Sequence, residues 1–317
     1  MHVVLATHYR LPVERYGGTE RVVVALARGL SALGHRVTLL AAPGTRVREA
    51  SVVEVPPATI TDPALDLGTL LPPDADVLHA HFPLRRVPSR PFAQTLHGDM
   101  AAGSKPPPNA IFLSQNHATR WGSGTFVYNG LDPADFTFRA AKDDYDLFVG
   151  RLHRVKGYRW AIAGARRTGR RLLLVGGWRP TLRPGIRFLG KVDQARKVAL
   201  LAGARCLWVP ALWDEQFGLT TIEALFSGTP VLATRRGSLP EIVTPAVGAF
   251  GDTLEELIAA AATIHTRDPA QCREHATRYF SHLAMAEGYV RMYAGLLETG
   301  TLPHGLATPH AASAASR

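Results

Sequence analysis

Short apolar strands alternate with helical stretches along almost the whole chain, and this alternation limits the fold more than any other feature. It is typical of a parallel sheet that is covered by helices on both faces. In the first half we expect a helix over residues 19–33, with Thr19 as its N-cap and Gly34 as its stop. The strands expected there are residues 2–7, 36–41, 76–81, 92–96, 110–114 and 125–128.

A turn cluster, YNGLDPADF at residues 128–136, interrupts the alternation, which then starts afresh. The chain has 317 residues, which is longer than one hydrophobic core usually grows, so we predict two doubly wound α/β domains in series, 1–130 and 131–280. An Ala/Ser/Pro-rich tail, 300–317, is expected to be disordered. The second half predicts strands at 146–149, 171–175, 186–189, 206–209 and 230–233 and near Gly248, and helices at 160–168, 194–202, 220–226, from 253 onward and at 283–297.

The composition favours a globular protein of the cytoplasm. Hydrophobic residues make up 46% of the chain, but each apolar run is far shorter than the roughly 20 residues of a spanning helix, so we expect no stable membrane insertion. The N-terminus enters an apolar run without a basic segment or a small-residue cleavage site, so we expect no secretion signal. Two cysteines, Cys206 and Cys272, are expected to be reduced thiols without an assigned role.

The formal net charge of +10 is concentrated in one stretch. Fourteen lysines and arginines lie between Arg151 and Lys197, against a single acid, Asp193. Nucleic acid, an anionic membrane surface or a phosphorylated small molecule could each be the partner, and a solvated basic face would need none. Only four aromatic residues interrupt this stretch, which makes no stacking platform, so we expect no nucleic-acid partner. Oligonucleotide binding with a steep salt dependence would revive a non-catalytic nucleic-acid-binding function.

The stretch DEQFGLTTIE, residues 214–223, places two glutamates around the start of a helix. Glu215 follows a strand, at the edge where open α/β sheets bind ligands. The backbone of residues 218–221 would expose unpaired N–H groups, which can hold a phosphate or a sugar hydroxyl. Thr220 and Glu223 also have the spacing of a capping box, which is a purely structural alternative for Glu223.

These stretches together resemble the retaining glycosyltransferases of family 4, whose GT-B fold has two Rossmann-like domains facing across a cleft. The two glutamates have the family's E-x7-E spacing, and the resemblance covers nearly the whole chain in the family's order. It also implies that residues 281–299 form a closing helix that crosses back to the first domain. The matching stretches are YGGTERVV (16–23), HAHFP (79–83), QTLHGD (94–99), FLSQN (112–116), VYNGLD (127–132), LFVGRLHRVKGYRWAI (147–162), LLLVGG (172–177), IRFLGKV (186–192), PALWDEQFGLTTIEALFSGTPVLAT (210–234) and GSLPEIV (237–243).

The resemblance implies a site for a nucleotide-diphosphate sugar. Arg151 and Lys156 would stabilise the negative charge that grows on the leaving diphosphate. Gly17 and Gly18 would let backbone amides approach it. His97, after a strand of the first domain, would face the donor sugar.

The same resemblance assigns the remaining donor contacts. Glu215 and the backbone of Phe217, Gly218 and Leu219, continued by Thr220, would bind the sugar hydroxyls. Glu223 would bind the ribose hydroxyls, which is compatible with a capping role because a carboxylate has about four acceptor sites. Lys191 and Val192 would border the base.

Two further histidines, His79 and His81, lie in one expected strand, where we expect them to point to opposite faces. His81 would then be a candidate on the acceptor side and His79 a packing residue.

The implied reaction is retaining transfer without a catalytic metal or other cofactor, by departure and attack on the same face of the sugar. The donor is expected to be UDP-linked, and the acceptor, bound by the first domain, is an unidentified sugar, lipid-linked molecule or small molecule. A sugar-nucleotide epimerase or hydrolase of the same fold is the alternative. Product analysis with the donor alone would separate the two, because neither alternative needs an acceptor.

Overall fold

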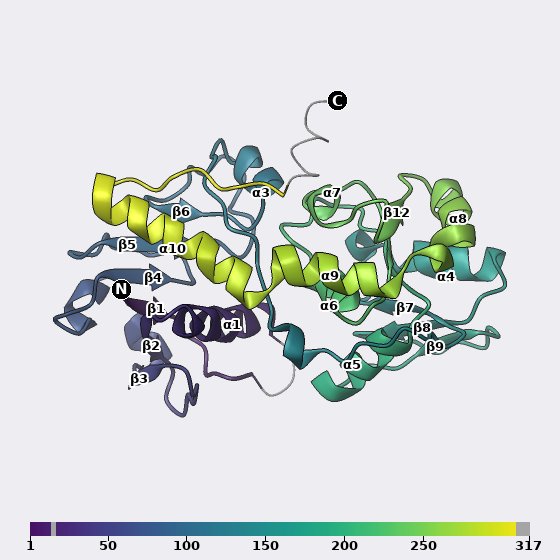
Figure 1. The fold of residues 1–317 in the computed structure, drawn as a ribbon, viewed down its shortest axis with the longest axis horizontal. Coiled ribbons are helices and arrows are strands. Elements are labelled where there is room, and N and C mark those ends of the chain that lie inside the picture. Colours follow the sequence, from purple (N-terminus) through teal and green to yellow (C-terminus); the bar gives the residue numbers. More distant parts are fainter. Residues whose placement is uncertain (14–16, 309–317) are drawn as a thin grey trace. The chain divides into compact units, whose positions relative to one another are not determined.

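The computed structural model describes residues 1–13 and 17–308 and divides into two compact units. Unit 1 comprises Met1–Asp132 and Phe280–Leu306, and unit 2 comprises Pro133–Tyr279 and the tail from Ala307. Each unit contains one six-stranded sheet in which every neighbouring pair of strands is parallel (Figure 1). The predicted α/β class with two parallel sheets is therefore confirmed.

Both sheets have the same strand order. In unit 1 the order is β3-β2-β1-β4-β5-β6, and in unit 2 it is β12-β11-β10-β7-β8-β9, which is the same order read from the other edge. This is the order of dinucleotide-binding folds, in which ligands bind where consecutive crossovers diverge, outside the carboxyl ends of the two central strands. That switch point lies between β1 and β4 in unit 1, and between β7 and β10 in unit 2.

Unit 1 is built around strands whose residues are buried on both faces. The inner residues of β1, including Val3, Val4 and Leu5, have no exposed surface, as expected for a central parallel strand. Helix α10 packs on α1, where an added Cβ on Gly29 would lie 2.3 Å from the His282 carbonyl oxygen. The elements are β1 (His2–Ala6), α1 (Gly18–Ala32), β2 (Arg36–Ala41), β3 (Ser51–Glu54), α2 (Pro57–Ile60), β4 (Val77–Ala80), β5 (Phe92–Thr95), β6 (Ala110–Ile111), α3 (Gln115–Arg120) and α10 (His282–Thr299).

Three expectations for unit 1 need correction or completion. Residues 125–128 form no strand; instead, Phe126 makes an isolated bridge to Phe112. Gly17, not Thr19, is the N-cap of α1. In the tail, the Gly305 amide donates to the Gly124 carbonyl at 2.9 Å, and residues 309–317 lie outside the described part of the chain.

Unit 2 follows the predicted alternation closely. The apolar core lies between the sheet and helices α4 and α8 and includes Trp208, Phe148 and Leu257. The elements are β7 (Asp146–Val149), α4 (Tyr158–Arg167), β8 (Leu172–Val175), β9 (Ile186–Phe188), α5 (Gln194–Gly203), β10 (Cys206–Val209), α6 (Leu219–Phe226), β11 (Val231–Ala233), α7 (Leu239–Ile242), β12 (Gly248–Phe250), α8 (Leu254–Thr263) and α9 (Pro269–Phe280).

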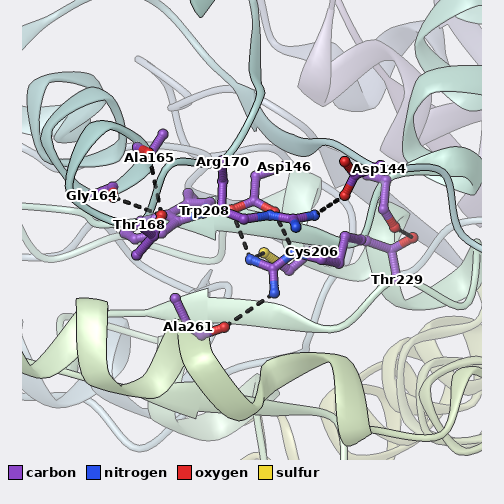
Figure 2. Close-up of polar contacts among 12 residues, drawn as sticks. Asp144, Asp146, Gly164, Ala165, Thr168, Arg170, Cys206, Trp208, Thr229 and Ala261 are labelled. Atoms are coloured by element: carbon purple, nitrogen blue, oxygen red, sulfur yellow. Dashed lines mark hydrogen bonds and ion pairs between the residues drawn. The ribbon is translucent and has the colours of Figure 1, made fainter. Parts of the chain in front are cut away.

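A buried ion pair ties the central strands of unit 2 together (Figure 2). Arg205 donates to both oxygens of Asp146, at 2.7 and 2.9 Å, and the Trp208 indole donates to the same carboxylate at 3.0 Å. A further guanidinium bond, to the Ala261 carbonyl at 3.1 Å, reaches α8. Because both carboxylate oxygens accept hydrogen bonds, the free-energy cost of burying the charge is compensated. The pair links β7 and β10 to α8.

Candidate functional site

The candidate site lies at the switch point of unit 2, where two loops follow the central strands. Residues 150–156 follow β7 and residues 210–218 follow β10. The Leu212 amide donates to the Val155 carbonyl at 2.7 Å and joins the loops directly. Gly157 has a positive φ of 71°, and an added Cβ would lie 1.7 Å from the Pro210 carbonyl oxygen. Only glycine therefore allows this close approach of the two backbones.

Lys156 and Glu215, predicted site residues from these two loops, form an ion pair. The Lys156 Nζ lies 2.5 Å from Glu215 Oε1, and the glutamate side chain is only 8% exposed. The Trp213 indole donates to the same oxygen at 2.8 Å, and its ring lies 4.5 Å from the ammonium group. Sequence reasoning did not identify Trp213, although an aromatic residue two positions before the glutamate was visible.

A third loop, after β11, supports the backbone around Glu215. The Ser238 amide donates to the Glu215 carbonyl at 2.9 Å, and its hydroxyl donates to the Phe217 carbonyl at 2.8 Å. Gly237, at φ 59°, leaves no room for a Cβ, which would lie 2.2 Å from the Glu215 carbonyl oxygen. These contacts fix the conformation of the loop that carries Glu215 and Phe217.

Helix α6 begins beside this loop, but not with the expected capping box. Its N-cap is Gly218, at φ 80° and ψ 64°, and no side chain caps it. Leu219 and Thr220 are instead the first residues of the helix, so the interpretation of Thr220 and Glu223 as a capping box was wrong. Their N–H groups, with no acceptor inside the helix, are available to an anionic or hydroxyl ligand.

Glu223 lies one turn further along α6 and pairs with Lys197 of α5. It is 1% exposed, and its two oxygens lie 3.0 and 2.9 Å from the Lys197 Nζ. The ion pair with the ammonium group compensates the burial of the carboxylate. Lys197 was counted in the basic stretch but not assigned to the site, because its pairing depends on how α5 and α6 pack.

The other predicted donor residues of unit 2 lie at the same carboxyl edge of the sheet. Arg151 follows β7 and is exposed. Lys191 and Val192 follow β9, with Lys191 exposed and Val192 partly buried. The structure thus brings Lys156 and Glu215 into contact, whereas Arg151, Lys191 and Val192 have no described contact with that pair.

Unit 1 carries a cluster of histidines at the ends of β4 and β5, in which His79 and His81 are buried and His97 is partly buried. The His81 Nδ1 lies 3.0 Å from the His97 Nε2, and the rings of His79 and His81 lie 4.3 Å apart. The expectation that His79 and His81 face opposite sides was wrong, because side chains two residues apart in a strand share a face. His79 is a packing residue, as its nitrogens bond the Tyr293 and Thr95 hydroxyls, each at 2.7 Å.

These histidines are neutral near pH 7. Burial lowers the pKa of His79 and of His97 to about 3, and it lowers the pKa of His117 to about 4. Burial also lowers the pKa of His81, which has two histidine neighbours. His97 can therefore donate or accept a hydrogen bond, but it cannot act as a cation at neutral pH.

Acid should consequently destabilise unit 1. The unfolded chain binds a proton at His79 below its ordinary pKa of 6.5, whereas the folded chain does so only near pH 3. Above pH 6.5, His79 is neutral in both states and costs the folded state nothing. When the pH is lowered to about 5, the free energy of unfolding should fall by about 2 kcal/mol, because only the unfolded chain gains the proton. Urea unfolding measured at about pH 6.5 and about pH 5 tests this. In His79→Gln, the decrease in the free energy of unfolding between the two pH values should be smaller than in the wild type by the contribution of one histidine. His265→Gln, at an exposed histidine, should leave it unchanged; equal slopes in both variants would contradict the assignment.

A pocket of about 390 Å³ lies at the switch point of unit 1. It is lined by His8, beyond β1, and by Phe82, beyond β4, with an apolar floor and a rim that includes Asp62, Arg85 and Arg86. Gly17 and Gly18 begin α1 in the same unit, with the first N–H groups of the helix beside them. Their contact with a diphosphate stays a prediction.

Two Asp-x-Asp triplets occur in the chain, and both serve the fold. Asp146 is bound by Arg205 and Trp208, and Asp76 accepts the His2 amide at 2.7 Å. Across residues 1–13 and 17–308, no group of three or more His, Cys, Asp or Glu side chains is arranged so that it could hold a metal ion. The expected lack of a catalytic metal remains a prediction.

Within residues 1–13 and 17–308, every helix is too short or too polar to cross a bilayer.

Two family models match the chain in series. Residues 16–132 match a model described as Glycosyltransferase Family 4, and residues 144–267 match one described as Glycosyl transferases group 1. Among curated proteins, the glycogen synthase of Mycobacterium tuberculosis is 30% identical over 174 residues, which are 48% of this chain and 42% of the relative. The chain spans less than half the length of the curated relatives that it matches.

Solved structures match over nearly the whole chain. AviGT4, a glycosyltransferase involved in avilamycin A biosynthesis, is 30% identical with a TM-score of 0.76, and the match covers 95% of this chain and 99% of that one. Anabaena HepE, solved in complex with UDP and glucose, is 17% identical with a TM-score of 0.65, and the match covers 93% and 99% of the two chains. At that identity, HepE shows similarity of fold alone.

Proposed function

This chain belongs to glycosyltransferase family 4, and we propose that it transfers a sugar from a UDP-sugar to an acceptor hydroxyl with retention of configuration. One observation carries the proposal: the Lys156–Glu215 pair lies beside the uncapped start of α6, at the switch point of unit 2. A cation, a carboxylate and helix N–H groups are what a phosphorylated sugar needs from its site. The HepE structures, which share the fold, were solved with UDP, which supports a nucleotide-sugar donor, and UDP is the diphosphate proposed here.

Lys156 has a double role in this proposal. Its ammonium group has three hydrogens, so one bond to Glu215 leaves two for the diphosphate. As the bond between the sugar and the β-phosphate breaks, negative charge grows on that phosphate. Lys156 and Arg151 stabilise this charge in place of a metal. The leaving phosphate oxygen then takes the acceptor proton as the acceptor attacks the same face.

The carboxylates position the donor. Glu215, held by Trp213 and Lys156, accepts hydrogen bonds from sugar hydroxyls, together with the backbone at Phe217, Gly218 and Leu219. Glu223, paired with Lys197, accepts from the ribose hydroxyls. Lys191 and Val192 border the base. His97 is a neutral hydrogen-bonding group for the sugar, and the acceptor binds in unit 1, at the pocket of His8 and Phe82.

Thermal unfolding with a panel of UDP, GDP, ADP and TDP tests the donor. A ligand at about one hundred times its dissociation constant adds about 2.7 kcal/mol to the free energy of unfolding, and UDP should give the largest rise in Tm. The rise should shrink in Lys156→Ala. If no diphosphate raises Tm, or if the variant responds as the wild type does, the assignment fails. Release of free sugar or an epimerised donor without acceptor would identify a hydrolase or epimerase instead.

A further inference from the structure

The crossover from β8 to β9 lacks the helix that such a connection normally contains. Residues 176–185 join these parallel strands as a loop, whereas every other connection between strands of unit 2 contains a helix. A crossover helix would cover the sheet beside α4. A pocket of about 440 Å³ is lined by residues of α4, this loop and β9. Strand β9 lies at the edge of the sheet, next to β8 (Figure 1).

The rim of this pocket is strongly basic. Arg159 and Arg166 come from α4, and Arg179 and Arg183 come from the loop; all four are exposed. The lining contains no acidic residue, and none of the four guanidinium groups makes an ion pair within the described chain. The Arg179 guanidinium lies 5.5 Å from the ring of Tyr158, which also lines the pocket. An occupant of this surface must therefore be anionic.

The same loop exposes two large apolar side chains. Trp178 is 69% exposed, and Leu182 is 102% exposed. Each precedes an arginine of the rim directly in sequence, Arg179 and Arg183. Exposed tryptophan and leucine beside arginines are typical of surfaces that enter the interface of a bilayer, where arginines reach the phosphates and the apolar side chains enter the acyl boundary.

We propose that this surface, formed by Trp178, Leu182 and the four arginines, docks the protein on a bilayer that contains anionic phospholipids. A nucleic acid would leave the aliphatic Leu182 in water, and only one exposed aromatic side chain is present for stacking. A protein interface usually places charges at its rim around an apolar centre, whereas here two projecting apolar side chains stand among four arginines. Because neither Lys156 nor Glu215 lines this pocket, the proposal does not depend on the proposed activity.

Vesicle co-sedimentation of the full chain tests this docking. At low salt, the wild type should bind vesicles of phosphatidylcholine with roughly one third phosphatidylglycerol at least about tenfold more tightly than phosphatidylcholine alone. Leu182→Ser/Arg183→Gln should weaken that binding about tenfold or more, since it removes one inserted side chain and one cation. Added salt should weaken it as well, because surface charges are screened.

A matched control is available on α10. Arg291→Gln/Leu297→Ser also removes one exposed arginine and one exposed leucine, and it should bind anionic vesicles as the wild type does. Equal affinity for both vesicle types, or equal losses in the two double variants, would overturn the proposal. Displacement of the wild type from anionic vesicles by millimolar inorganic phosphate would also overturn it, since the pocket would then be a site for a free anion.

Discussion

Replacing Lys156 with alanine should lower kcat/KM for sugar transfer by about 10²–10³-fold, the usual cost of removing one donor that stabilises charge developing in the transition state. The residue is the ion-pair partner of Glu215, and its ammonium group contacts the Glu215 carboxylate directly. A coupled assay of UDP release with a competent acceptor measures the change. Since Glu215 loses its ion-pair partner in this variant, urea unfolding should be measured in parallel to separate lost activity from lost folding.

Two further variants test whether the loss of transfer is specific to the Lys156–Glu215 pair. Arg154→Ala removes an exposed cation from the same 3-10 turn and should leave kcat/KM within about threefold of the wild type. Glu215→Gln keeps an acceptor for the Trp213 indole and removes only the charge and the pairing, and it should also lose transfer. If Lys156→Ala retained wild-type kcat/KM, or if Arg154→Ala lost as much, the diphosphate would not lie against Lys156.

Replacing Gly157 with alanine should destabilise unit 2 by more than about 4 kcal/mol, which only a severe disruption of packing produces. The residue needs positive φ, and a Cβ would collide with the Pro210 carbonyl, a backbone atom that cannot move aside cheaply. The loops after β7 and β10 would separate, and stabilisation by UDP should be lost with them. Urea unfolding followed by Trp fluorescence, together with the UDP thermal shift, measures both effects.

Gly169→Ala is the matched control for this substitution. Gly169 also has positive φ, 67°, but a Cβ there would meet nothing within 4 Å. Its replacement should cost only the about 1–2 kcal/mol of a left-handed non-glycine residue. Similar losses in the two variants would show that backbone conformation alone, and not contact between the loops, sets the requirement for glycine at position 157.

Local sequence patterns were sufficient for most strands. The bounds of β2, β7 and β10 agree with the predicted ranges to the residue, because each is an apolar run between clear turn signals. The strand β3 was missed because its sequence, SVVE, is short and mostly exposed at a sheet edge. At residues 125–128, aromatic and β-branched residues suggested a strand, but only one bridge forms there. Tertiary context overrides propensity most readily in such short segments.

The helix start at α6 shows a second limit. Thr220 and Glu223 have the spacing of a capping box, but the left-handed conformation of Gly218 lets the helix begin at Leu219, so neither residue caps it. Glu223 is then buried against α5 and takes Lys197 as its partner. The role of the two carboxylates in binding a donor stays a prediction, and their ion-pair partners could not be assigned without the packing of neighbouring helices.

The sequence alone determined the α/β class, the two parallel sheets and the family, because alternating apolar runs record which local segments are buried. Only the tertiary structure decided the partners of the charged groups. Lys156 and Glu215 are 59 residues apart in sequence, and Lys197 and Glu223 are 26 apart, so their contact depends on strand order and helix packing. It also decided that Trp178 and Leu182 are exposed, since no helix covers that part of the sheet. Periodicity describes burial along one element, whereas pairing and exposure depend on which elements become neighbours.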